Sequence, residues 1–166
     1  MKPETITKQI FKIIPALLLV TLSAFLLQGD VWTFWTWYLL ALVLGAAAMP
    51  LTGRLFRRFQ DRGWMFSKVT AIAVSGFLTW FLVAVKIIKF TTMTCIVVTL
   101  VCAAASLILY CREQKAGFEC IPFAHLDLVY AEELLFFTAF LLWTYFAGFH
   151  PAAYGTEKFM DYGFME

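Results

Sequence analysis

Charged residues are scarce in this sequence. Of its 166 residues, only 14% are Asp, Glu, Lys or Arg, whereas 62% are hydrophobic and 18% are aromatic. A soluble globular domain usually carries about 25% charged residues. The mean hydropathy of +0.80 departs from soluble domains in the same direction. The composition therefore excludes a water-soluble domain and indicates an integral membrane protein.

Several common functional signatures are also missing. The four cysteines show neither CxxC nor His-paired spacing, so the sequence indicates no zinc site and no disulfide framework. It contains no internal repeat, no low-complexity segment and no glycine-rich loop that would hold a nucleotide phosphate. The net charge of +2 is too small to indicate a nucleic-acid partner. The lipid bilayer is the one partner that the composition predicts.

Long charge-free runs dominate the chain. Their residue ranges are 13–29, 31–53, 69–85, 90–111 and 134–156. Each run is near the roughly 20 residues that an α-helix needs to cross the hydrocarbon core, and none alternates like a barrel strand. We therefore expect an all-α polytopic protein of the cell membrane, with about five transmembrane helices in a single domain, residues 1–166. The expected spans lie near residues 10–28, 31–50, 66–87, 90–111 and 131–150.

The basic residues predict the orientation of these spans. Ten of the thirteen fall in segments that share one side if every run crosses the membrane. Cytoplasmic loops are rich in Lys and Arg, so we expect the N-terminus inside and the C-terminus outside. The inner loop 52–68 interleaves basic and aromatic residues. We interpret it chiefly as a topology signal, with binding to anionic lipid as the alternative.

Few polar groups within the runs need an explanation. No charged residue lies near the middle of a run, so the sequence indicates no ion-coupled transporter. Glu132 and Glu133 begin the fifth span, where we expect them to interact with the positive end of the helix dipole. Gly45 lies in a patch of small residues that predicts close helix packing. The segment Asp61–Arg62–Gly63 predicts a turn before the third span.

The last twelve residues, 155–166, carry the candidate chemistry. If this segment is helical, Glu157 and Asp161 lie four residues apart on one face, beside Lys158. Two neighbouring carboxylates bind a divalent cation, or one serves as a base while the other tunes it. The spacing alone is common in solvated helices, so it does not define a reaction.

Segments across most of the chain resemble the YYY membrane proteins, large polytopic proteins that carry a domain of unknown function. The matching segments are WYLLALVLG (37–45) with Pro50, Phe56, DRG (61–63), Ser67 and Lys68, Trp80, ELLFFTAFLLW (133–143) and GTEKFMD (155–161). The resemblance implies the N-terminal part of a glycosyltransferase of the C superfamily, which uses a lipid-phosphate sugar donor.

The resemblance also implies roles for residues of the C-terminal motif. Asp161 would act as the catalytic base at the outer membrane face, with Glu157 as its neighbour. Lys158 would contact the phosphate of a polyprenyl-phosphate sugar. No metal ligand is indicated otherwise, but a divalent cation such as Mg²⁺ or Mn²⁺, if one is used, would bind Asp161 and Glu157.

The chain departs from the YYY pattern in two ways. It lacks the tyrosine-rich segment and the later helices, and Ala147–Phe149 stand where the family often has a basic residue. We therefore expect a truncated or split protein that is inactive alone, with the missing C-terminal part as a partner. The alternative function is a small non-enzymatic membrane subunit or scaffold, whose outer tail serves as a contact site.

Overall fold

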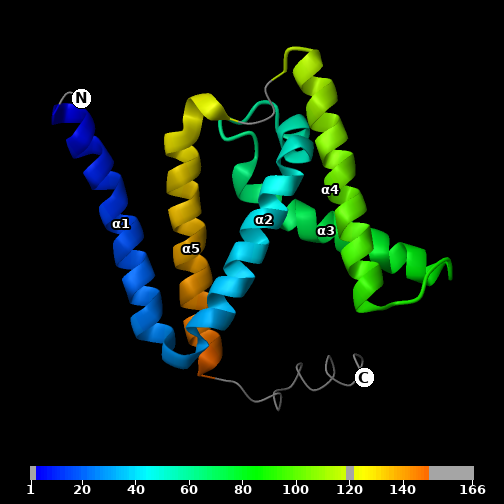
Figure 1. Cartoon of the computed structure of the whole chain (residues 1–166), viewed down its shortest axis with the longest axis horizontal. Helices are drawn as coiled ribbons and strands as arrows, with labels where there is room; N and C mark the ends of the chain where they lie inside the picture. Colours follow the sequence, from blue (N-terminus) through cyan, green and yellow to red (C-terminus); the bar gives the residue numbers. More distant parts are fainter. Residues whose placement is uncertain (1–2, 119–121, 150–166) are drawn as a thin grey trace. The chain divides into compact units, whose positions relative to one another are not determined.

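The computed structural model describes residues 3–118 and 122–149, which form helices joined by short connections (Figure 1). The α-helices are α1 (Pro3–Leu27), α2 (Val31–Leu55), α3 (Trp64–Ala84), α4 (Thr92–Lys115) and α5 (Leu126–Gly148), with short 3₁₀ helices η1 (Gln28–Asp30) and η2 (Phe123–His125). No strand occurs among the described residues. The predicted all-α fold is therefore confirmed.

The helices have the length and composition of membrane spans. Among the described residues, three helical stretches are long and apolar enough to cross a bilayer: Lys12–Leu55, Trp64–Ala84 and Thr92–Lys115. The first contains α1 from Lys12 onward, η1 and α2, and its 44 residues are about twice the length of one span. The helix α5 is not among them, and three acidic residues in its first eight lower its hydropathy. Large apolar side chains exposed along the helices suit contact with lipid.

A tight turn starts α3. Arg62 and Gly63 both have left-handed backbone conformations, with φ of 54° and 76°. Glycine adopts this conformation at no steric cost, and a Cβ atom at Gly63 would lie 2.6 Å from Cδ2 of Phe56. The turn predicted at Asp61–Arg62–Gly63 is thus confirmed. It sets the first residue of α3 at Trp64, and so the face on which Trp64 and Lys68 lie.

The chain forms two compact units, residues 1–34 with 137–166 and residues 35–136. In the described part of the first unit, Phe34 lies against Phe137 and Phe140, with ring centroids 5.4 and 5.2 Å apart. Phe34, Phe137 and Leu141 are buried there. Aromatic packing therefore holds the start of α2 to α5. The single domain expected from the sequence stays a prediction.

In the second unit, α2 and α3 approach closely at Gly45. A Cβ atom at this glycine would lie 2.8 Å from Cγ of Lys68 and 2.9 Å from Oγ of Ser67. Ser67 and Lys68 are both buried. The close packing predicted for the small-residue patch is confirmed at this position, and it brings the buried face of α3 against α2.

Candidate functional site

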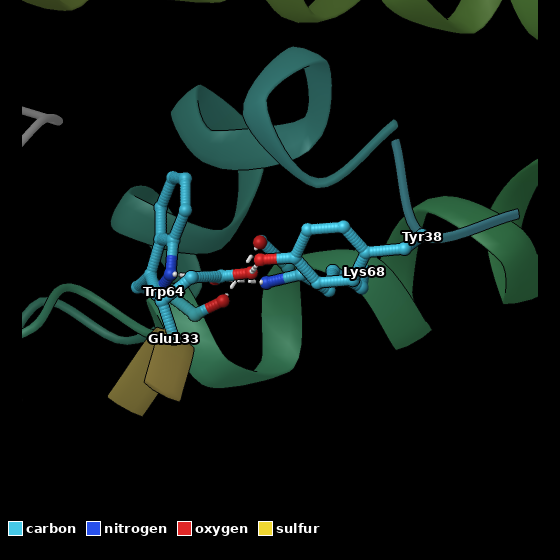
Figure 2. Close-up of polar contacts among 5 residues, drawn as sticks. Tyr38, Trp64, Lys68 and Glu133 are labelled. Atoms are coloured by element: carbon cyan, nitrogen blue, oxygen red, sulfur yellow. Dashed lines mark hydrogen bonds and ion pairs between the residues drawn. The ribbon is translucent and has the colours of Figure 1, made fainter. Parts of the chain in front are cut away.

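The carboxylate of Glu133 accepts three hydrogen bonds from three different side chains (Figure 2). Lys68 Nζ lies 2.7 Å from its Oε2 atom, and Trp64 Nε1 lies 2.9 Å from the same atom. Tyr38 Oη donates to Oε1 at 2.7 Å. We call these four residues the Glu133 cluster. It joins α2, α3 and α5 within the second unit.

The sequence places the members of the Glu133 cluster by simple helical spacing. Trp64 and Lys68 are four residues apart, so they share one face of α3. Tyr38 and Gly45 are seven residues apart on α2, two turns along one face. Because Gly45 has no side chain, the stem of Lys68 passes against α2 toward Glu133. The position of the Lys68 side chain therefore depends on the absence of a side chain at Gly45.

The Glu133 cluster is a buried ion pair surrounded by aromatic rings. The Lys68 side chain is 3% exposed and that of Glu133 is 18% exposed. The Lys68 ammonium also lies 4.9 Å from the Trp64 ring centroid and 4.6 Å from that of Phe136. Ring faces attract cations, and this attraction offsets part of the cost of removing the ammonium from water. Charge and hydrogen bonds are thus satisfied inside the helix assembly.

A second carboxylate, that of Glu132, lies beside the Glu133 cluster. Its Oε2 atom is buried and unpartnered. The charge of the buried Asp61 repels Glu132, whereas that of Lys68 attracts it. Glu132 therefore interacts with charges of both signs. Among the residues that the structure describes, however, no group of three or more acidic, His or Cys side chains has the geometry to hold a metal ion.

The structure corrects the expected positions and roles of Lys68 and Glu133. The sequence analysis counted Lys68 in the inner loop 52–68, although the expected span near residues 66–87 also includes it. The structure places Lys68 within α3, which begins at Trp64, and leaves the residue 2% exposed, so it is not a loop residue. The expectation that Glu133 serves the helix dipole missed its ion pair, since the partner is 65 residues away in the sequence.

The structure does not describe the residues that were predicted to carry chemistry. Glu157, Lys158 and Asp161 fall outside the described residues. The residues that the structure does bring together were matched only through the resemblance, whose segments contain Asp61, Lys68 and Glu133. Their shared membership in these segments singled the residues out, but it did not predict that Lys68 and Glu133 are in contact.

The arrangement of the Glu133 cluster fits a structural role, the joining of three helices, better than a catalytic role. The carboxylate already accepts three hydrogen bonds, and the lysine is enclosed by protein. A catalytic base needs an accessible lone pair within hydrogen-bond reach of its substrate. The cluster instead holds α2, α3 and α5 in one register.

The fold and composition define an all-helical, multi-pass membrane protein. The chain belongs to the family described as uncharacterized membrane protein (DUF2298), whose profile matches residues 74–166, more than half of the chain. This stretch includes α4, α5 and the C-terminal acidic motif. No curated protein and no solved structure matches the chain.

Proposed function

We propose that the chain is the N-terminal membrane portion of a glycosyltransferase C-like protein, which transfers a sugar from a polyprenyl-phosphate donor at the outer membrane face. The observation that carries this proposal is the position of the motif GTEKFMD (155–161). It follows α5 in the sequence and lies within the stretch that matches the membrane protein family.

The proposed reaction assigns each polar residue of the motif a role. Asp161 accepts the proton of the acceptor hydroxyl as its oxygen attacks the anomeric carbon of the sugar. The bond between that carbon and the phosphate oxygen breaks, and the lipid phosphate leaves with the electron pair. Lys158 stabilises the charge on the phosphate, and Glu157 tunes the basicity of Asp161. A divalent cation, where one takes part, binds to the two carboxylates.

The described residues support this role indirectly. The Glu133 cluster joins the beginning of α5 to α2 and α3. The same helix leads along the chain to the acidic motif. Catalytic groups work best when rigid elements position them, and a buried ion pair is a means of fixing such an element.

The test is an Asp→Asn substitution at the position of Asp161 in a full-length relative. We expect the loss of sugar transfer from a labelled polyprenyl-phosphate donor, at an unchanged level of protein in the membrane. Asp30→Asn is the matched control, because Asp30 is exposed in η1 on the same predicted side. Unchanged transfer by the Asp161→Asn variant would refute the catalytic assignment.

The alternative is a non-enzymatic membrane subunit, and one observation favours it. A cavity of about 180 Å³ between α2, α3 and α4 is lined almost wholly by apolar groups, and the buried Lys68 is paired with Glu133. This cavity therefore offers few polar groups that would bind a sugar. In this case deletion of residues 155–166 abolishes co-purification of a partner protein, whereas Asp161→Asn leaves it unchanged. If the motif is catalytic instead, Asp161→Asn abolishes sugar transfer, whereas deletion of residues 155–166 leaves the co-purification unchanged.

A further inference from the structure

A group of arginines gathers where α2 ends and α4 ends. We call Arg54, Arg57, Arg58, Arg62 and Phe118 the basic patch. Arg54 lies in the last turn of α2, the next three arginines lie in the connection to α3, and Phe118 follows α4. The ends of membrane-spanning helices lie at the level of the lipid headgroups. The basic patch therefore faces the region where phosphate groups are concentrated.

Two arginines of the basic patch, Arg57 and Arg62, are held in place before any ligand binds. The Cζ atoms of Arg57 and Arg62 lie 4.5 and 4.8 Å from the centroid of the Phe118 ring. Arg62 Nη1 also donates a hydrogen bond to the Arg57 carbonyl oxygen, and Arg57 Nη2 lies 3.0 Å from Glu113 Oε2. A flexible arginine loses rotamer entropy when it binds an anion, and here part of that loss has already occurred.

The charge of the basic patch is only partly compensated. Glu113 pairs with Arg54 at 3.3 Å and with Arg57 at 3.0 Å. Arg58 and Arg62 form no ion pair with any residue that the structure describes. An arginine guanidinium presents a planar fork of donors that matches the oxygens of a phosphate group. Neither arginine has a counter-charge among the described residues, and a phosphate group would supply one.

Apolar side chains beside the basic patch indicate that the anion carries a hydrocarbon part. Leu55 is 64% exposed and Phe59 is 52% exposed, and both lie between the arginines in the sequence. Inorganic phosphate has no apolar part that could contact these side chains, whereas the glycerol and upper acyl region of a lipid would cover them. The positive-inside rule requires only a number of basic residues, and it explains neither the stacking on Phe118 nor the apolar neighbours.

We propose that the basic patch binds the phosphate headgroup of an anionic phospholipid. Arg58 and Arg62 contact the phosphate oxygens, Arg57 and Phe118 hold Arg62 in place, and Leu55 and Phe59 contact the hydrophobic part of the lipid. This site is independent of the proposed glycosyl transfer, because it uses none of the residues of the C-terminal motif.

The test uses the purified, delipidated chain in a neutral detergent, titrated with phosphatidylglycerol and followed by native mass spectrometry. We expect the double variant Arg58→Gln/Arg62→Gln to bind this lipid roughly 30-fold more weakly, from the contribution of two basic residues at a membrane surface. Lys86→Gln/Lys89→Gln is the matched control, because it removes the same charge at exposed positions outside the basic patch. It should bind phosphatidylglycerol like the unmodified chain.

Three outcomes would overturn the proposal. An equal loss in the control pair would mean that only net charge matters. Equal binding of zwitterionic phosphatidylcholine would mean that the phosphate contacts give no selectivity. Competition by inorganic phosphate at the same concentration as the lipid would identify a site for free phosphate instead. Arg58→Gln alone, at an exposed residue, keeps the test valid if substitution of Arg62 disturbs folding, and a roughly fivefold loss is then expected.

Discussion

Lys68 Nζ lies 2.7 Å from Glu133 Oε2, and this contact joins α3 to α5 across 65 residues of sequence. Buried ion pairs are costly to form, because both charges leave water. The cost is lower here, since Tyr38 and Trp64 also donate hydrogen bonds to the carboxylate. The pair thus depends on all three helices of the Glu133 cluster being present.

Removal of one member of the pair should be far more damaging than removal of both. Lys68→Met leaves a buried carboxylate without its counter-charge, and we expect a loss of about 3–5 kcal/mol in the free energy of unfolding. Lys68→Met/Glu133→Met replaces both charges by apolar groups and should cost less than the single variant. Thermal unfolding in detergent micelles measures the difference. Lys89→Met, at an exposed lysine, is the control and should have little effect.

The equal stability of Lys68→Met and Lys89→Met would contradict this account. It would mean that the ammonium of Lys68 reaches water in the membrane and does not depend on Glu133.

The hydroxyl of Tyr38 should stabilise the Glu133 cluster measurably. Tyr38→Phe keeps the ring beside Phe136 but removes the 2.7 Å hydrogen bond to Glu133. Hydrogen bonds to charged groups contribute about 1.5–3 kcal/mol, so we expect a loss of this size in detergent unfolding. Tyr145→Phe makes the same chemical change at a ring that contacts Phe146 and Phe149, and its effect should be smaller. Similar losses in both variants would argue against the hydrogen bond.

The helices and the turn were predictable from the sequence, whereas the Glu133 cluster was not. The charge-free runs indicated the helices because a span needs length and apolarity, which are local properties. The same procedure ended each run at the nearest charge, so Lys68 and Glu133 both looked like boundary residues. An ion pair between distant segments has no local periodicity. Only the spacing of Trp64 and Lys68 pointed to a shared helix face.

Gly45 should not tolerate a side chain without a loss of stability. Gly45→Ala places a Cβ atom 2.8 Å from Cγ of Lys68, so α2 and α3 must separate or the lysine must move away from Glu133. We expect a loss of about 1–3 kcal/mol, typical of overpacking. Gly76→Ala is the matched control, because no atom lies within 4 Å of the added methyl group. It should be neutral or stabilising, since alanine is the better helix former.

A destabilised Gly76→Ala variant would show that helix propensity and local space do not govern these positions. Two variants with the same chemical change thus separate the close approach at Gly45 from the general effect of replacing glycine.

The topology predicted from the basic residues can be tested at two described positions on either side of α4. In a variant without the natural cysteines, Lys89→Cys and Ala116→Cys each place one thiol at an exposed position. The segment after α4 is predicted to be cytoplasmic, so Ala116→Cys should react with an impermeant maleimide only after the cells are permeabilised. Lys89→Cys should react in intact cells. The reverse pattern would show that the protein has the opposite orientation. Labelling of both thiols in intact cells would mean that α4 does not cross the membrane.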